Sequence, residues 1–284
     1  MEYIEAFLFI SHLWNIEASM NNLDIYLRGE ALYGDDFNDD QLREWFDSEF
    51  NAYYNQLGEE KSYDYKFYAV DKYYGFKYIT EDNLNVLGIG SANGAELIPI
   101  LDKIKSLTII ENSDKYESFL IDNKKINYLR ANYRGVIDSP DNYYDLVICF
   151  STLHHIANVS FVISEMARVL KRNKIALIRE PIISMGDWNK PRVNLSKNER
   201  GIPLKIFRES INKAGFKIIS ESIWNFRPLV KLLFFYKDSI YNNLFLTIID
   251  QILSYLFRFN IRYYPTNIFH KVAPSAVFLV LKKL

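Results

Sequence analysis

Three glycines are the residues of this sequence whose spacing best fits the binding of a small molecule. The segment NVLGIGSANGAELIPIL, residues 85–101, places Gly88, Gly90 and Gly94 at the end of an apolar run and directly before a helical pattern. Glycine lets a ligand approach the backbone closely and adopts positive φ angles without strain. The N-terminus of a following helix favours the polar groups of a nucleotide. We therefore expect a nucleotide-like ligand at this turn, with a ligand-free glycine turn as the alternative.

The sequence around the turn narrows the class of ligand. The dinucleotide fingerprint G-x-G-x-x-G is not met, because Asn93 stands where the third glycine is needed, and this disfavours NAD and FAD. The sequence also lacks the G-x-x-x-x-G-K-S/T motif of Walker-type nucleotide sites. Glu111 ends the next apolar run, where a carboxylate can accept hydrogen bonds from both ribose hydroxyls of an adenosine.

Two adjacent histidines and a second glutamate are candidates for acid–base chemistry beside that ligand. His154 and His155 follow the apolar run DLVICF, and Glu180 ends the run KIALIRE. Imidazole titrates near neutral pH, which suits a general base. A carboxylate can orient the imidazole and stabilise its protonated form. The structural alternative is that one histidine only caps the helix that follows.

These residues lie in a stretch where strand and helix patterns alternate. Apolar runs predict strands at residues 85–90, 107–111, 126–131, 145–150, 174–180, 216–222 and 275–284. Helical patterns occupy residues 93–104, 114–123, 158–171 and 203–214. The alternation predicts an α/β fold with a parallel sheet covered by helices on both faces. Such sheets bind ligands at the carboxyl ends of their strands, which is where the glycines, the glutamates and the histidines fall.

Residues 1–80 read as helical and aromatic. Asn38 and Gln41 have the spacing of a capping box, and Gly58 can end the helix that they begin. One face of this helix carries Leu42, Trp45, Phe46 and Phe50. The segment can close over the ligand and exclude water, or it can simply add to the core, which we slightly prefer.

The insertion at residues 229–274 has an unusual pattern. In NLFLTIIDQILSYLFRF nearly every residue is apolar except for a narrow polar stripe at helical spacing, formed by Asn243, Thr247, Asp250, Gln251, Ser254 and Arg258. A helix with so much apolar surface has to be covered. We expect it to be buried within the fold, with a dimer interface or a lipid surface as the alternatives.

The composition excludes several classes of protein. With 49% hydrophobic and 24% charged residues in a chain of 284, a folded core is expected and disorder is not. A net charge of −1 argues against a dedicated nucleic-acid binder. The single cysteine, Cys149, excludes a disulfide framework, and no metal-ligand spacing is present, so we expect no bound metal. The acidic N-terminus and the absence of a long apolar segment favour a cytoplasmic protein.

Residues 84–225, together with the terminal strand, resemble the class I S-adenosylmethionine-dependent methyltransferases. The block DNYYDLVICFSTLHHIANVSFVISEMARVLKRNKIALIREP is similar to the family's fourth strand, the helix after it and its fifth strand, and AGFKIISES matches the turn into the sixth strand. The resemblance implies a Rossmann-like, seven-stranded, mostly parallel sheet with a reversed last strand. It also implies S-adenosylmethionine as the cofactor. From the resemblance together with the helical pattern before residue 81, we expect an N-terminal helical cap at residues 1–80 and a methyltransferase domain at residues 81–284.

The resemblance assigns roles to residues of the glycine turn and of the strand ends. Glu111 would hold the ribose, and Asn132 would lie near the adenine edge. The expected cofactor-binding residues are Gly88, Gly90, Ser91, Gly94, Glu111, Asn132, Phe150 and Ser151. The family usually has an acid at the position of Gly88, so cofactor binding here either is weaker or uses another carboxylate. A methyltransferase-like protein that no longer catalyses remains an alternative.

The paired histidines are similar to those of sugar O-methyltransferases. That resemblance makes His155 the general base, His154 a helper and Glu180 the carboxylate partner of the base. The acceptor would be a small-molecule or glycan-type hydroxyl. The apolar insertion and the basic residues at positions 229–284 motivate a second hypothesis, a lipid-linked or quinone-like acceptor with contact to a membrane surface. A non-catalytic binding or scaffold protein is the third, and a homodimer is compatible with all of them.

The loop at residues 181–203 follows Glu180 and is expected at the same mouth. Its candidate residues for acceptor contact are Asp187, Trp188, Arg192, Asn194, Arg200 and Gly201. Tryptophan can pack on the face of a sugar ring, and arginine suits a phosphate or a carboxylate. The alternative is an ordinary connector.

Overall fold

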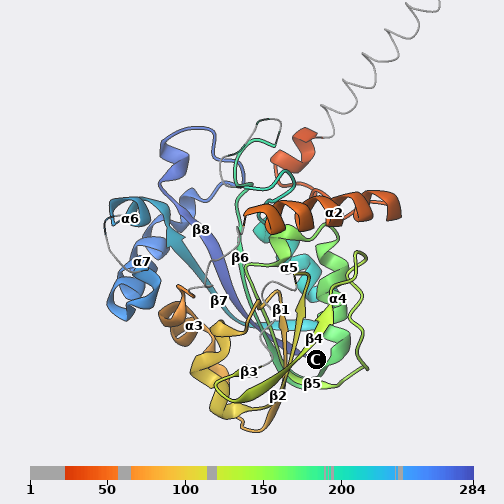
Figure 1. Ribbon diagram of the computed structural model, residues 1–284. Coiled ribbons are helices and arrows are strands. Elements are labelled where there is room, and N and C mark those ends of the chain that lie inside the picture. The colour runs from red at the N-terminus through yellow and green to blue at the C-terminus, as the bar shows by residue number, and fades with distance from the viewer. Residues whose placement is uncertain are drawn as a thin grey trace, which may run out of the picture.

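Eight strands form the central sheet of the described part of the chain. The computed structural model describes residues 23–56, 65–113, 120–188, 190, 192, 195–233, 235 and 239–284. The sheet order is β3-β4-β2-β1-β5-β6-β8-β7 (Figure 1). The strands are β1 Leu84–Ile89, β2 Ile104–Glu111, β3 Leu120–Ile121, β4 Lys124–Arg130, β5 Tyr144–Phe150, β6 Leu170–Pro181, β7 Phe216–Phe226 and β8 Pro274–Lys283.

This sheet confirms the predicted Rossmann-like fold. All seven predicted strands are present, and β8 runs antiparallel to both of its neighbours, β6 and β7, as the reversed last strand. The eighth strand is the short β3, which pairs antiparallel with β4. The strands that surround the site, β1, β2, β4, β5 and β6, are mutually parallel, so their carboxyl ends lie together at one edge.

The predicted helices are only partly confirmed. Helix α4 at Val159–Val169 and helix α5 at Leu204–Lys213 lie where their patterns indicated. The segment predicted as a helix at residues 93–104 is instead a 3-10 helix, η2 at Ala95–Lys103, with Pro99 in its interior. Proline has no N–H to donate and clashes with the preceding turn of an α-helix, which accounts for the difference. Most of the prediction at residues 114–123 lies outside the described residues, and its end is strand β3.

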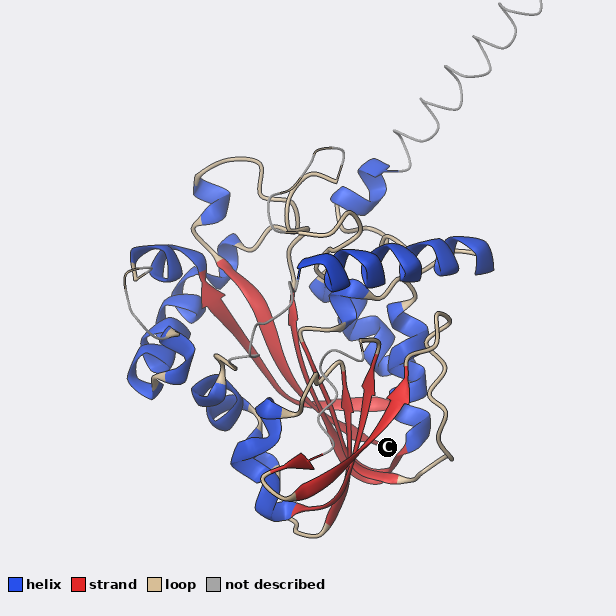
Figure 2. Cartoon of the chain, viewed as in Figure 1, coloured by secondary structure: helices blue, strands red, loops and turns tan. Residues whose placement is uncertain are grey.

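Helices cover both faces of the sheet (Figure 2). On one face α4 and α5 contribute Ile163, Met166 and Phe207 to the core. On the other face α3, at Tyr68–Tyr74, and η2 contribute Val70 and Leu97. The near-continuous burial of β1 and β5 follows from this double covering, as their unbroken apolar sequences predicted. Cys149 in β5 is buried and free.

Helix α2, at Asp39–Gln56, lies across the end of the sheet to which the parallel strands point (Figure 1). Its capping box is confirmed, because the Asn38 N–H donates to Gln41 Oε1 and the Gln41 N–H donates to Asn38 Oδ1, each at 3.0 Å. Leu42 and Trp45 are buried beneath the helix. Gly58, predicted to end it, lies outside the described residues.

In the insertion before β8, the helix with the polar stripe has the opposite orientation from the one predicted. The insertion contains α6 at Arg227–Leu232, η5 at Ile240–Asn242, α7 at Leu244–Phe257, η6 at Arg258–Asn260 and η7 at Phe269–Lys271. The polar side of α7 faces inward, with Thr247, Asp250 and Ser254 buried, whereas the side chains of Phe245 and Leu256 are exposed. Our expectation that the apolar side would be buried within the fold is therefore wrong.

Asp250 explains this orientation of α7. Its carboxylate accepts hydrogen bonds from the N–H groups of Asn225 at 2.9 Å and Phe226 at 2.7 Å, where β7 ends. Gln251, the next residue, accepts at its Oε1 from the hydroxyl of Tyr73 in α3. Backbone N–H groups buried at a strand end need an acceptor, and α7 supplies it from its polar side.

Asp250→Ala removes that acceptor and leaves two N–H groups without it, that of Phe226, which is buried, and that of Asn225, which is partly buried. We expect the free energy of unfolding, measured by urea denaturation, to fall by roughly 2–4 kcal/mol. Gln251→Ala on the same helix loses one neutral hydrogen bond and should cost about 1 kcal/mol or less. Equal losses in the two variants would show that the carboxylate does not hold α7 in place.

Candidate active site

The glycine turn after β1 is built for close contacts. Gly90 and Gly94 have φ angles of 65° and 77°, which disfavour any residue with a side chain. A Cβ atom on Gly90 would also lie 2.3 Å from Thr152 Oγ1. The Gly90 N–H donates to the Ile110 carbonyl at 2.8 Å, which fixes the turn against the end of β2. The turn thus brings the end of β1 against both β2 and the segment that follows β5.

Glu111, at the end of β2, joins the glycine turn to the next loop. Its carboxylate accepts from the N–H groups of Ala92 at 3.1 Å, Asn112 at 2.8 Å and Ser113 at 3.1 Å. Burial raises the pKa of this carboxyl above its usual range, while the three N–H donors oppose that rise. Glu111 is therefore held in a fixed position at the place that the sequence predicted.

A pocket opens beside Glu111 at the carboxyl ends of the strands. Its walls include four of the predicted cofactor residues, Gly90, Glu111, Asn132 and Ser151, together with Thr152 and His155. Helix α2 closes one side with Leu42, Trp45, Phe46, Glu49 and Phe50. The aromatic face of this helix therefore lines the pocket as well as adding to the core.

The other four predicted cofactor residues do not line this pocket. Gly94 packs on apolar side chains of the sheet, and Phe150 points to the opposite face, beneath the guanidinium of Arg179. A Cβ atom on Gly88 would lie 2.3 Å from Ser91 Oγ, so the turn has no room for the acid that the family usually carries there. Ser91 in turn donates to Glu96 Oε1 at 2.6 Å.

Glu96 does not replace the missing acid as a fixed negative charge. Burial raises the pKa of its carboxyl to about 8, which the hydrogen bond from Ser91 only partly offsets. At neutral pH the protonated form therefore predominates. The carboxylates that do line the pocket are Glu111 and Glu49.

The turn that carries both histidines, η4 at Leu153–His155, is held from two sides. Glu180, at the end of β6, accepts from the N–H groups of Thr152 and Leu153, each at 2.8 Å. The guanidinium of Arg200 donates to the carbonyls of Leu153, His154, Ile156 and Ala157 at 2.8 to 3.3 Å. Arg200 is fully buried, and burial lowers its pKa to about 10. A carboxylate and a guanidinium thus take up the backbone donors and acceptors of this turn.

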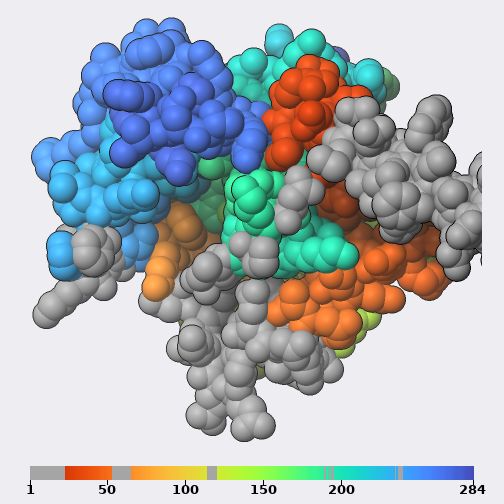
Figure 3. Space-filling model, turned by 90° about the horizontal axis from the view of Figure 1, so that it is seen from above, coloured from red at the N-terminus to blue at the C-terminus, as the bar shows by residue number. Residues whose placement is uncertain are grey.

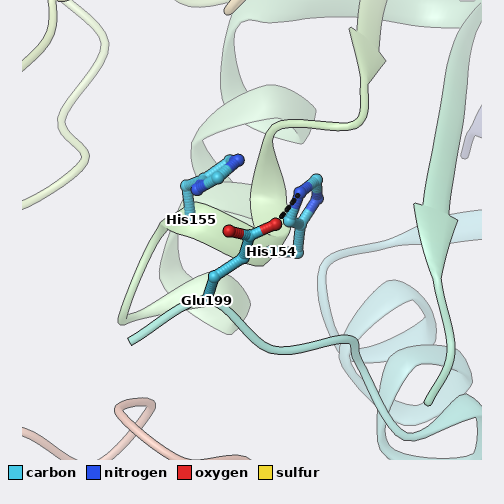
Figure 4. A group of neighbouring side chains, drawn as sticks. All are labelled: His154, His155 and Glu199. Atoms are coloured by element: carbon cyan, nitrogen blue, oxygen red, sulfur yellow. Dashed lines mark ion pairs between the residues drawn. The ribbon is translucent and has the colours of Figure 1, made fainter. Parts of the chain in front are cut away.

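His154 lies between two carboxylates. Its Nδ1 is 2.7 Å from Glu180 Oε2. On the other side of the ring, its Nε2 is 3.6 Å from Glu199 Oε1, the contact drawn in Figure 4. Burial opposes the charged imidazole, but Glu180 and Glu199 outweigh that effect and raise the pKa of His154 to about 9. His154 is therefore an imidazolium at neutral pH, and a group that already holds its proton is not a general base.

His155 has a different partner from the one predicted. Its Nδ1 is 3.0 Å from Glu49 Oε2 in α2, and its ring lines the pocket. The predicted pairing of His155 with Glu180 is wrong, because Glu180 holds His154 instead. The sequence signal for Glu49 was its place four residues after Trp45, which puts the carboxylate on the aromatic face of α2.

Glu49 and the turn are joined by further contacts. The Ser196 hydroxyl donates to Glu49 Oε2 at 2.7 Å, and the indole N–H of Trp45 donates to the His155 carbonyl at 2.7 Å. Glu49 Oε1 is buried and has no hydrogen-bond partner among the described residues. Helix α2 thus fixes both the backbone and the ring of His155.

Folding also brings together three side chains that could share a metal ion. His154, His155 and Glu199 each place one donor atom within 4.8 Å of the others (Figure 4). The sequence showed no metal-ligand spacing because Glu199 comes from a distant loop. In the structure the positive charge of protonated His154 is already balanced by Glu180 and Glu199.

The loop at residues 181–203 is a packed connector at this mouth. Trp188 stacks on Tyr33 with 5.3 Å between ring centroids, and Arg192 donates to the carbonyls of Glu199 and Ser196. A Cβ atom on Gly201 would lie 2.1 Å from the Ile183 carbonyl. Of the remaining candidates, Asp187 pairs with Lys190. Arg200 holds the histidine turn, as described above. Asn194 lies outside the described residues. The described side chains of this loop thus contact other parts of the protein, as in the alternative of an ordinary connector.

Comparison with known proteins agrees with this fold. The family described as "Methyltransferase domain" matches residues 87–178. A ubiquinone biosynthesis O-methyltransferase of Rickettsia akari is 28% identical over 100 residues, which are 34% of this chain and 39% of that protein. The chain therefore matches only about two fifths of that relative's length.

Two solved structures share the architecture. A putative sarcosine dimethylglycine methyltransferase from Galdieria sulphuraria has a TM-score of 0.53 at 16% identity, with 84% of this chain and 98% of the other covered. The cyclase SpnF has a TM-score of 0.52 at 13% identity, with 89% and 97% covered. At such identities the likeness concerns the fold alone.

Residues 87–178 match a methyltransferase domain, for which the sequence resemblance implies S-adenosylmethionine as the cofactor. The pocket fits this group. Glu111, Gly90 and Asn132 all line the pocket, so Glu111 would be available to the ribose hydroxyls and Asn132 would lie on the same wall. The two carboxylates at the pocket, Glu111 and Glu49, suit a cofactor that carries a sulfonium and an ammonium charge.

Glu111→Ala is expected to weaken the binding of S-adenosylmethionine. The variant loses the ribose acceptor and frees the N–H of Ala92 in the glycine turn, which together should raise the Kd about 10-fold to 100-fold. Isothermal titration calorimetry with the cofactor and with S-adenosylhomocysteine measures the effect. Asp82→Ala, an exposed carboxylate away from the pocket, serves as the control, and equal affinities in both variants would contradict the assignment.

His154 should make stability depend on pH. Its folded-state pKa of about 9 lies above the usual value of 6.5, so its contribution is complete below about pH 6.5 and is lost as the pH rises through 9. Relative to His154→Gln, the wild type should thus be most stabilised near pH 6, and the difference in Tm should shrink toward pH 9. A difference that does not change over this range would show that His154 is not charged in the fold.

Proposed function

We propose that the chain transfers the methyl group of S-adenosylmethionine to a hydroxyl oxygen of a small-molecule or glycan-type acceptor, with His155 as the general base. The observation that carries the proposal is the His155–Glu49 pair in the pocket wall, 3.0 Å apart and linked to the lining of α2. S-adenosylmethionine supplies an electrophilic methyl group when it is bound. The chain supplies the remaining needs of the reaction, which are the placement of the hydroxyl, removal of its proton and exclusion of water.

The Glu49 carboxylate sets the tautomer of the His155 ring. A carboxylate beside Nδ1 favours the form in which Nδ1 carries the hydrogen, so the lone pair of the neutral ring is on Nε2. That nitrogen accepts the hydroxyl proton as the new carbon–oxygen bond forms. The carboxylate then stabilises the imidazolium, as the third member of a catalytic triad does.

His154 and Glu180 act as positioning residues in this proposal. Neither lines the pocket, and both are almost fully buried. Glu180 fixes the backbone from Thr152 to Leu153 and holds the imidazolium of His154, so that His155 projects from a rigid turn. The two histidines thus differ in environment, because His154 is buried between carboxylates and His155 borders the pocket.

Helix α2 has the second task of excluding water. Trp45, Phe46 and Phe50 form an apolar wall over the pocket. Water would otherwise compete for hydrogen bonds with the acceptor hydroxyl and weaken the interaction between the base and its proton. Glu49 comes from the same helix. Helix α2 therefore supplies both the apolar wall of the pocket and the carboxylate partner of the base.

A lipid-linked or quinone-like acceptor is the second candidate. It is supported by the similarity to a protein named ubiquinone biosynthesis O-methyltransferase and by the exposed apolar side of α7. The insertion that carries α7 also reaches the active-site loop, because the Tyr263 hydroxyl donates to the Gly201 carbonyl at 2.8 Å. The hydroxyl chemistry at His155 would be the same for either acceptor.

A non-catalytic binding protein is the third hypothesis, and the likeness to a cyclase shows that this fold serves other reactions. A protein that only binds the cofactor has no need for an oriented imidazole at the pocket. The variants of His155 and Glu49 therefore separate this hypothesis from the first two.

His155→Ala should lower kcat about 100-fold or more and leave the Kd of S-adenosylmethionine within about 2-fold of the wild type. Glu49→Gln should lower kcat about 10-fold, and the double variant should be no slower than His155→Ala, because the two residues act as a unit. Formation of S-adenosylhomocysteine over a panel of sugars, phenols and isoprenoid quinols measures these effects.

The variant His270→Ala, at a partly exposed histidine outside the pocket lining, serves as the control for this series and should keep wild-type turnover. Unchanged turnover in His155→Ala would remove His155 from the mechanism. Additive losses in the double variant would show that Glu49 acts through something other than the imidazole.

A further inference from the structure

The exposed side of α7 is an apolar surface with no cover in the described structure. Leu244, Phe245, Ile252, Tyr255, Leu256 and Phe259 are between 54% and 74% exposed. The first five lie in α7, where their spacing places them on one side of the helix because residues three, four and seven apart share a side. Phe259 follows in η6. We call these six residues, together with Ile268 and Phe269 of the loop that follows, the α7 apolar face. Isolated exposed apolar residues are ordinary, but a contiguous group of this size indicates an interaction site.

The loop after α7 extends the same surface. The Asn260 side chain donates to the carbonyls of Phe269 and Val272 at 2.7 and 2.9 Å, which returns the chain to the end of α7. This closure brings Ile268 and Phe269, 74% and 77% exposed, back to that end of the helix. Figure 3 shows the insertion, in blue, as a projecting part of the molecule seen from the end that carries the pocket.

The α7 apolar face is fixed in its outward position. The buried polar side of the helix is tied to β7 by Asp250 and to α3 by Gln251. Rotation of α7 to bury the apolar side would therefore leave the N–H groups of Asn225 and Phe226 without an acceptor. The exposure is thus built into the fold.

The exposed charged side chains of the insertion that the structure describes are of one sign. Among the described residues of the insertion the basic side chains are Arg227, Lys231, Arg258, Arg262 and Lys271, and the only carboxylate is Asp250, which is buried. Apolar side chains with a basic surround are typical of a helix that lies in the interface of an anionic membrane. Two copies of the chain meeting through this face would instead place like charges against one another.

We propose that the α7 apolar face docks the protein on an anionic membrane surface. Helix α7 has 14 residues, so it is too short to cross a hydrocarbon layer of about 30 Å and would lie parallel to the surface. No helix among the described residues is long and apolar enough to cross a membrane. Phe245, Leu256 and Phe259 enter the acyl boundary, and the basic residues meet lipid phosphates. This inference concerns docking and does not depend on the proposed methyl transfer.

Co-sedimentation with vesicles tests the proposal on the full chain. The wild type should bind vesicles of phosphatidylcholine mixed with phosphatidylglycerol at least about 10-fold more strongly than pure phosphatidylcholine vesicles, and the difference should shrink as salt is added. Phe245→Ser with Leu256→Ser should lower binding about 10-fold or more, because two buried apolar side chains are lost. Amide hydrogen exchange within residues 244–259 should slow when the anionic vesicles are present.

The matched control carries Ile98→Ser and Phe161→Ser, two exposed apolar residues away from the α7 apolar face. It should bind as the wild type does, and both double variants should keep the wild-type Tm. Failure of the wild type to bind anionic vesicles, or equal loss in the control, would overturn the proposal. So would a wild-type dimer in solution that the Phe245→Ser, Leu256→Ser variant converts to a monomer, or a soluble protein that occupies the face and prevents vesicle binding.

Discussion

The active-site mouth depends on how the backbone between Thr152 and Ala157 is held. Glu180 accepts hydrogen bonds from its N–H groups, and Arg200 donates to its carbonyls. Both side chains are buried, where such charged hydrogen bonds are strong and an unmade one is costly. The register of β5 with β6 pairs Phe150 with Arg179, and so places Glu180 directly beside the residues that follow β5. One strand pairing thus determines where both histidines project.

The same constraint separates the two histidines chemically. His154 lies between Glu180 and Glu199, and the attraction of two carboxylates exceeds the cost of burying a charge. His155, one residue on, borders the pocket and has Glu49 beside its Nδ1. Adjacent residues of the same type therefore receive different environments, which is how one short turn can provide both a structural cation and a candidate base.

Amphipathic helices usually bury their apolar side, but helix α7 buries its polar side instead. Its polar stripe serves as the internal acceptor for the end of β7, and its apolar residues face outward. Burial of the polar side is stable because every polar group there meets a partner, as with Asp250 and the two N–H groups that it accepts from. The outward apolar side then becomes available for a partner of matching chemistry. The fold thus carries a candidate docking surface on the same insertion that touches the active-site loop.

The sequence by itself determined the strands, the glycine turn, Glu111 and the capping box of α2. Each of these depends on local periodicity or on the φ angles that only certain residues accept. Tertiary structure alone decided which carboxylate lies beside each histidine. His155 and Glu49 lie 106 residues apart, and nothing in a linear pattern distinguishes Glu49 from Glu180 as the carboxylate beside that ring. Periodicity likewise revealed the polar stripe of α7 but not which side faces inward, because that choice rests on unpaired N–H groups at the end of a different element.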